Sequence, residues 1–202
     1  MFEGKNLDLK IEAEEILKIQ GHERGTDIKY LVNYAKLKKG EEGHRQIVEA
    51  LRAIGYELPD IDKLDNMEWI PASLPTIYMV AMAKVFEWTE QDLVDMGKSL
   101  MSYSTIMRVF VKFFVSPLQT FKAGAKRWNI HYDFGHGEVT DFTGHSLVFR
   151  LSNFKKHKAT CYYLLGFFTT IVELGTGSKN VKTIERKCVF NGDDCHEFYF
   201  SW

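Results

Sequence analysis

The sequence has little of several features that mark particular classes of protein. It holds four prolines and three cysteines in 202 residues, and no repeated or low-complexity segment. An odd, small number of cysteines argues against a disulfide framework and fits free thiols or metal ligands in a reducing compartment. The longest apolar runs, such as 109–115 and 162–168, are too short to span a bilayer. We therefore expect neither a disulfide-rich secreted protein nor a membrane-spanning one.

The sequence also lacks an excess of charge of either sign. Its 26 basic and 27 acidic residues leave a formal net charge of -1, which indicates no attraction to nucleic acid or to an anionic membrane. The first residues carry no apolar signal-peptide run, so a cytoplasmic protein is expected. Hydrophobic residues make up 45% of the chain, a composition typical of a folded globular protein.

Helical spacing dominates the first half of the chain. Apolar residues recur every three or four positions before Gly55, a plausible helix stop, and they are Ile47, Val48, Leu51 and Ile54. A second helix is expected over about 74–88, and Thr89 would open a third. Three of the four prolines lie within 59–75, which predicts a long loop or hinge. We therefore divide the chain into a helical region, 1–58, and an α/β region, 59–202, within one compact domain.

The second half changes to period-two alternation. Residues 130–134 and 147–151 read as strands separated by a glycine-rich segment. Residues 160–174 are apolar nearly all round, which predicts a buried helix with Gly175 as its cap. Two closing strands, 181–190 and 195–201, flank an Asn-Gly-Asp-Asp turn. The expected fold class is α+β: a helical N-terminal half, an antiparallel sheet with a buried helix packed on it, and a closing β-hairpin. Residues 104–115 fit either a helix or a strand.

All three cysteines fall in this closing region. Cys161 begins the buried helix, Glu185 and Cys188 lie on the penultimate strand, and Cys195 begins the last strand. Residues three apart on an ideal strand point to opposite faces, so Glu185 and Cys188 could share an ion only if the strand bulges between them. Three thiolates and a carboxylate would suit a closed, structural zinc site. The alternative is that Cys161 is a small core residue and the other two are free thiols beside a turn.

Basic side chains near these residues could offset the negative charge of such a ligand set. They are Lys182, Arg186, Lys187 and His196.

The order of these residues resembles a known family. The segments Cys161-Tyr-Tyr-Leu-Leu-Gly, Glu185-Arg-Lys-Cys188 and Gly192-Asp-Asp-Cys195 are similar to the 4-vinyl-reductase-type, hydrocarbon-binding domain of phenol- and xylene-responsive activators. The resemblance implies a zinc ion held by Cys161, Glu185, Cys188 and Cys195. The wider superfamily includes haem nitric-oxide sensors and vesicle-tethering subunits. Because the chain lacks the Tyr-x-Ser-x-Arg haem signature, no haem is expected.

Aromatic residues supply a candidate pocket for an apolar or aromatic ligand. Core packing would use the same residues, so the assignment applies to them as a set. The six candidates are Phe110, Phe113, Phe114, Trp128, Tyr132 and Phe142.

Two other patterns are weaker. His131, His136 and His145 could form a histidine site but read better as surface residues. The segment 175–179, Gly-Thr-Gly-Ser-Lys, lacks Walker spacing and follows a helix instead of preceding one.

The function expected from the sequence is that of a small-molecule-binding sensor with a structural zinc, acting as a homodimer. The alternative is a protein–protein assembly module of the same fold without a ligand. With no legible catalytic or nucleotide-binding motif, we do not expect an enzyme.

Overall fold

The computed structural model describes residues 2–103 and 116–202, and of residues 2–7 and 101–103 it describes the backbone only. The chain divides into two compact units, Met1–Thr89 and Glu90–Trp202. The boundary between the units lies after Thr89. It therefore lies within 59–202, which we expected to be one α/β region. Each unit has a hydrophobic core of its own. No helix in the described part of the chain is long and apolar enough to cross a membrane.

The first unit is mainly helical. Its elements are α1 (Phe2–Ile16), β1 (His22–Arg24), α2 (Gly25–Ala53), the 3-10 turn η1 (Ile61–Lys63), β2 (Trp69–Pro71) and α3 (Ser73–Val85). Strands β1 and β2 pair antiparallel. Helix α3 packs against α1 and α2 and is buried over most of its length, because its sequence is apolar on every side. The predicted helical character of this region is confirmed.

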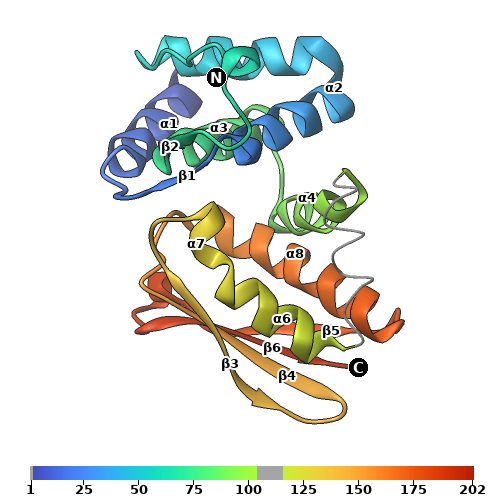
Figure 1. Ribbon diagram of the computed structural model, residues 1–202. Coiled ribbons are helices and arrows are strands. Elements are labelled where there is room, and N and C mark those ends of the chain that lie inside the picture. Colours follow the sequence, from blue (N-terminus) through green and yellow to red (C-terminus); the bar gives the residue numbers. More distant parts are fainter. Residues whose placement is uncertain (1, 104–115) are drawn as a thin grey trace. The chain divides into compact units, whose positions relative to one another are not determined.

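Two glycines shape α2. Gly40 has φ 68° and kinks the helix, so that the segment before it and the amphipathic segment after it run in different directions (Figure 1). Gly55, with φ 84°, ends the helix as predicted, and the Tyr56 amide donates to the carbonyl oxygen of Leu51. The predicted loop 59–75 is shorter than expected, because Pro75 lies in the first turn of α3, where the missing N–H is tolerated.

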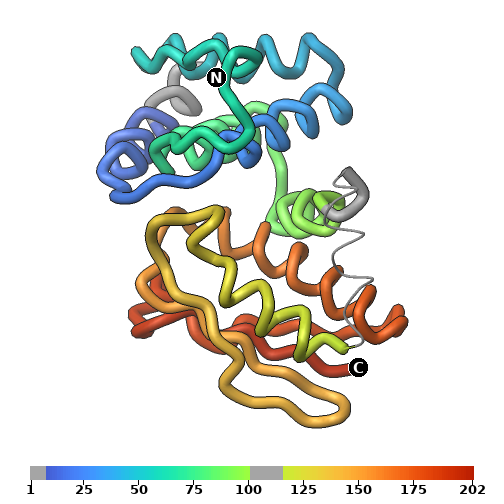
Figure 2. Tube along the Cα trace, in the orientation of Figure 1, coloured from blue at the N-terminus to red at the C-terminus, as the bar shows by residue number. Residues whose placement is uncertain are grey.

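The second unit combines helices with one sheet. Its elements are α4 (Glu90–Tyr103), α6 (Pro117–Lys126), α7 (Trp128–His131), β3 (His136–Phe142), β4 (Ser146–Ser152), α8 (Lys158–Thr176), β5 (Lys182–Lys187), η2 (Val189–Asn191) and β6 (Cys195–Ser201). All four strands pair antiparallel in the order β3-β4-β6-β5. The path through the β3–β4 hairpin and the closing strands can be followed in Figure 2. The predicted fold class is therefore confirmed.

One face of the sheet carries the core of this unit. Phe149 of β4 and Phe198 and Phe200 of β6 meet Phe168 of α8 and Phe121 of α6. Helices α6 and α8 lie on the same face of the sheet (Figure 1). Helix α6 starts at Pro117, where the sequence indicates: Ser116 caps it by accepting from the Gln119 amide, with Pro117 at the first position.

Two local predictions are wrong. Residues 130–134 form no strand: α7 occupies 128–131, Gly135 turns the chain with φ 78°, and Ile130 is 45% exposed, so the alternation does not line a buried face. Helix α8 does not end at Gly175 but runs to Thr176, and Gly177 caps it with φ 72°. The ambiguous segment 104–115 lies outside the described residues.

Candidate metal centre

Helix α8 places the first of the four clustered side chains. His157 is its N-cap residue, and the Nδ1 atom of His157 accepts from the Ala159 amide at 3.1 Å, which fixes where the helix begins. Cys161 lies in the first turn after this cap and is buried. The thiol therefore faces the sheet from a rigid position.

Strand β5 and the residue following it place two more side chains. Its pairing with β6 shifts register between Glu185 and Lys187, which is the bulge that the spacing of Glu185 and Cys188 requires. On an ideal strand the side chains of Glu185 and Cys188 would point to opposite faces. Because of this bulge, both reach the same cluster. The Cys188 amide donates to Oδ2 of Asp193 at 2.8 Å, which holds the loop after β5 in place.

Strand β6 places the fourth side chain, and it is not the predicted one. Alternate residues of β6 face the core, and His196 is among them together with Phe198 and Phe200. Neighbouring strand residues point to opposite faces, so Cys195 turns away from the core face. The Cys195 thiol instead lies 3.5 Å from Oδ1 of Asp194. In the sequence pattern, His196 is only one of the basic side chains that could offset the charge of the ligand set.

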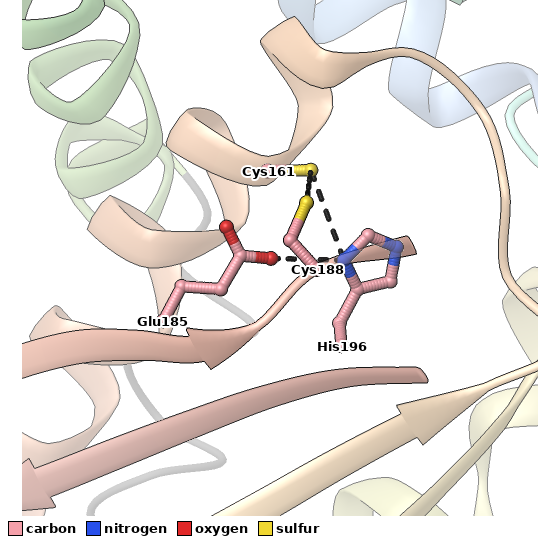
Figure 3. Close-up of side chains that lie close together, drawn as sticks. All are labelled: Cys161, Glu185, Cys188 and His196. Atoms are coloured by element: carbon pink, nitrogen blue, oxygen red, sulfur yellow. Dashed lines mark hydrogen bonds and ion pairs between the residues drawn. The ribbon is translucent and has the colours of Figure 1, made fainter. Parts of the chain in front are cut away.

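The four side chains converge closely (Figure 3). One ligand atom from each of Cys161, Glu185, Cys188 and His196 lies within 4.8 Å of the others. The two sulfur atoms of Cys161 and Cys188 are 3.7 Å apart, and Nδ1 of His196 lies 3.8 Å from Sγ of Cys161 and 2.8 Å from Oε1 of Glu185. We call these four residues the metal centre. The structure thus brings together three of the four predicted ligands and adds His196, while Cys195 lies outside the group.

Hydrogen bonding orients the imidazole of His196. Its Nε2 atom lies 2.9 Å from the carbonyl oxygen of Phe154, an acceptor only, so Nε2 carries the hydrogen and donates. In the neutral ring Nδ1 is then a lone-pair acceptor, and it faces a carboxylate oxygen of Glu185, which also accepts. Two acceptors at 2.8 Å need a cation between them, either a proton or a metal ion.

Burial governs the thiol chemistry of this centre. Desolvation, with further contributions from the charges of Glu185 and Cys188, raises the pKa of the Cys161 thiol well above its ordinary range. Burial and the neighbouring Asp194 also raise the pKa of the Cys195 thiol. Without a cation, therefore, Cys161 is a neutral thiol at physiological pH and a poor nucleophile.

The predicted pocket residues are only partly brought together. Trp128 and Tyr132 stack with ring centroids 4.6 Å apart, whereas Phe142 lies beside Trp202 and is 38% exposed. Phe110, Phe113 and Phe114 lie outside the described residues. A surface hollow of about 300 Å³ on α6 is lined by none of the six, and its lining residues are Gln119, Lys122, Ala123 and Lys126.

The other sequence patterns do not form sites in the described structure. His131, His136 and His145 are all exposed and do not belong to the metal centre. The segment 175–179 comprises the end of α8 and the capping turn at Gly177, as its position after a helix indicated.

The fold is similar to that of H-NOX proteins. A structure of an H-NOX protein from S. oneidensis in the Fe(II)NO ligation state has a TM-score of 0.68 at 11% identity and covers 88% of this chain and 98% of that chain. The Fe(II) unliganded H-NOX protein from K. algicida has a TM-score of 0.65 at 11% identity and covers 88% and 95%. No family model and no curated protein sequence matches the chain. The likeness is one of fold alone, so the superfamily relationship and the narrower 4-vinyl-reductase resemblance both stay predictions.

This similarity contradicts the expectation of no haem. A further structure of the same fold, with a TM-score of 0.56 at 12% identity, is named "Modulating Heme Redox Potential Through Protein-Induced Porphyrin Distortion" and covers 89% and 99% of the two chains. The missing Tyr-x-Ser-x-Arg signature was therefore too narrow a reason to exclude haem.

Histidine and cysteine are two of the side chains that hold haem iron in proteins, and every histidine and cysteine of the chain lies in the described part. His196, Cys161 and Cys188 face one another in the metal centre. His44 contacts the Tyr78 hydroxyl and His157 caps α8, while the remaining histidines are exposed. Among these described histidines and cysteines, the contacts therefore mark none as an axial ligand for haem iron.

Proposed function

We propose that this chain is a ligand-binding sensor or regulatory domain whose second unit is held together by one structural zinc ion. The observation that carries the metal proposal is the convergence of Cys161, Glu185, Cys188 and His196, with Nδ1 of His196 and a carboxylate oxygen of Glu185 facing each other at 2.8 Å. Sulfur, nitrogen and oxygen donors in a set of four are those of tetrahedral zinc sites with no open position.

The charge of these four ligands suits a divalent ion better than does the charge of the four ligands predicted from the sequence. Two thiolates and one carboxylate carry three negative charges, one fewer than three thiolates and a carboxylate, because the neutral imidazole of His196 replaces a thiolate. A divalent ion would therefore leave one uncompensated charge instead of two.

The position of the centre indicates a structural role. Its ligands come from the first turn of α8, from the end of β5 and from the start of β6. An ion there would tie the buried helix to the closing hairpin, and its binding free energy would become folding free energy.

The sensor part of the proposal rests on the fold shared with H-NOX proteins, one of which is described in an Fe(II)NO ligation state. The proposed ligand is a small apolar or aromatic molecule. Clustered aromatic side chains around Trp128 and Tyr132 support this choice, because apolar ligands bind among such side chains. We further propose that the protein acts as a homodimer in the cytoplasm.

Native mass spectrometry of freshly purified protein, with metal analysis of the same sample, tests these points together. We expect one zinc per chain, a mass corresponding to two chains, and a bound small molecule released on denaturation. A metal-free protein that does not take up added zinc would contradict the metal proposal. A zinc-loaded dimer that never retains or binds an apolar molecule would favour the assembly-module alternative instead.

A further inference from the structure

The orientation of His196 is set from outside the metal centre. Its Nε2–H group donates to the carbonyl oxygen of Phe154, which is 2% exposed and lies in the connection between β4 and α8. No strand ladder holds that carbonyl. Its position therefore depends on how the Phe154 side chain and the adjoining backbone are held.

The Phe154 ring contacts the His196 ring, with centroids 6.4 Å apart, and packs against three other aromatic rings. We call Phe154 and the residues of those three rings the aromatic cluster. Trp128, Tyr132 and Phe134 lie 5.5, 5.7 and 5.2 Å from the Phe154 ring between ring centroids. The Trp128 indole N–H donates to the Phe134 carbonyl oxygen at 2.8 Å. A Cβ atom on Gly135 would lie 3.0 Å from the Phe154 ring, so the cluster is tightly closed on this side.

The backbone of Asn153, the residue before Phe154, also affects where the Phe154 carbonyl lies. Asn153 has φ 52°, in the left-handed region that few side chains other than asparagine and aspartate tolerate. Such a conformation persists where the surroundings hold it. The ring contacts of Phe154 are the contacts next to this turn, so they hold both the turn and the carbonyl that follows it.

We propose that Phe154 is a positioning residue that couples the aromatic cluster to the metal centre. This inference rests on the proposed metal centre and goes beyond it. The carbonyl of Phe154 keeps Nδ1 of His196 directed at the ion, and the ring of Phe154 transmits any movement of His196 to Trp128. Occupation of the metal centre and the arrangement of the aromatic cluster therefore influence each other.

The first test measures metal affinity in the full chain. Phe154→Leu keeps the carbonyl but removes the ring contacts, and zinc competition titrations should show binding weaker by roughly tenfold or more. The absorption bands of Co²⁺ bound in place of zinc should also change, because the ligand geometry loosens. Phe121→Leu is the matched control: Phe121 is 4% exposed, and its ring contacts Phe149, Phe168 and Phe200, none of which belongs to the aromatic cluster or to the metal centre. It should lower stability while leaving zinc affinity and the Co²⁺ spectrum unchanged.

The second test follows the coupling in the other direction. Added zinc should change the tryptophan fluorescence of metal-free protein, and the change should be lost in Trp128→Phe, in which Trp69, Trp88 and Trp202 remain. Two results together would overturn the coupling and leave the metal centre intact. They are a zinc affinity in Phe154→Leu equal to that of the wild type and a fluorescence response to zinc that survives in Trp128→Phe. No zinc binding by the wild-type chain would overturn the metal centre and the coupling together.

Discussion

Gly97 on α4 and Gly166 on α8 mark the point where these two helices touch backbone to backbone. A Cβ atom on Gly97 would lie 1.9 Å from the carbonyl oxygen of Tyr163, and one on Gly166 would lie 1.9 Å from the carbonyl oxygen of Val94. Each glycine thus faces the backbone of the opposite helix. Because α8 also carries Cys161, this crossing sets the position of the metal centre relative to α4.

Adding a methyl group at this crossing should destabilise the second unit. For Gly166→Ala and Gly97→Ala we expect a loss of about 1–3 kcal/mol or more in the free energy of unfolding, because neither helix backbone can yield without separating the pair. Chemical denaturation of the full chain measures the loss. Gly124→Ala on α6 is the control: nothing lies within 4 Å of its Cβ position, so this change should be neutral or stabilise by about 0.5–1 kcal/mol. Equal effects at all three sites would contradict the close crossing.

The loop before β6 should tune the affinity of the metal centre. Asp193→Ala removes the acceptor of the Cys188 amide hydrogen bond, so Cys188 is held less well, and zinc affinity should fall by roughly tenfold. Asp194→Ala, at the neighbouring position, removes contacts to Lys187 and Cys195 only, and zinc affinity should stay within about twofold of the wild type. Zinc competition titrations that rank the two variants in the reverse order would show that this hydrogen bond does not position Cys188.

Metal binding should depend on pH. Burial raises the pKa of the Cys161 thiol, so in the metal-free protein this group is protonated at neutral pH, and an ion must displace its proton. Zinc affinity should therefore rise with pH between about 6 and 8, with about one to two protons released per ion bound. Isothermal titration calorimetry in buffers of different ionisation enthalpy counts these protons. Binding without proton release would mean that Cys161 is not a ligand.

The first unit should lose stability in mild acid. Desolvation, with Lys36 adding to it, lowers the pKa of His44 below its ordinary value of 6.5, and Nδ1 of His44 lies 2.8 Å from the buried Tyr78 hydroxyl. The folded state thus favours the neutral ring. Its stabilisation is present above pH 6.5 and is lost as pH falls through the folded-state pKa, because the unfolded chain then binds the proton more readily.

His44→Gln should flatten this pH dependence. Denaturation midpoints of metal-free protein, followed through Trp88 between about pH 7.5 and 5, measure it, since Trp88 contacts Tyr34 and Phe86 in the first unit. An unchanged slope in His44→Gln would assign the acid sensitivity to other groups.

Much of the second unit follows from sequence pattern alone. The alternation at Leu147, Phe149 and Leu151 predicted β4, and the apolar segment after His157 predicted α8, because in both cases the pattern matches a buried face. The segment 130–134 shows the same alternation without such a face. Its rings at Tyr132 and Phe134 pack on Phe154, a contact between distant residues that local pattern cannot reveal.

The metal centre shows the same limit. Spacing required a bulge between Glu185 and Cys188, and the structure has a register shift there. Spacing could not choose between Cys195 and His196, since the choice depends on which residues of β6 face the core. Phe198 and Phe200 are fully buried, and residues two apart on a strand point to the same face, so His196 faces the core with them. The alternation of His196, Phe198 and Phe200 is present in the sequence, but spacing alone does not show which face of the strand meets Cys161 and Cys188.

The zinc content of two neighbouring variants tests the central claim most directly. Elemental analysis of purified Cys195→Ser should find about one zinc per chain, as in the wild type, because Cys195 lies outside the metal centre. His196→Gln should lose most of its zinc, and His196→Cys, which restores a zinc ligand at the same position, should regain it. Zinc lost from Cys195→Ser and retained by His196→Gln would contradict this account of the site.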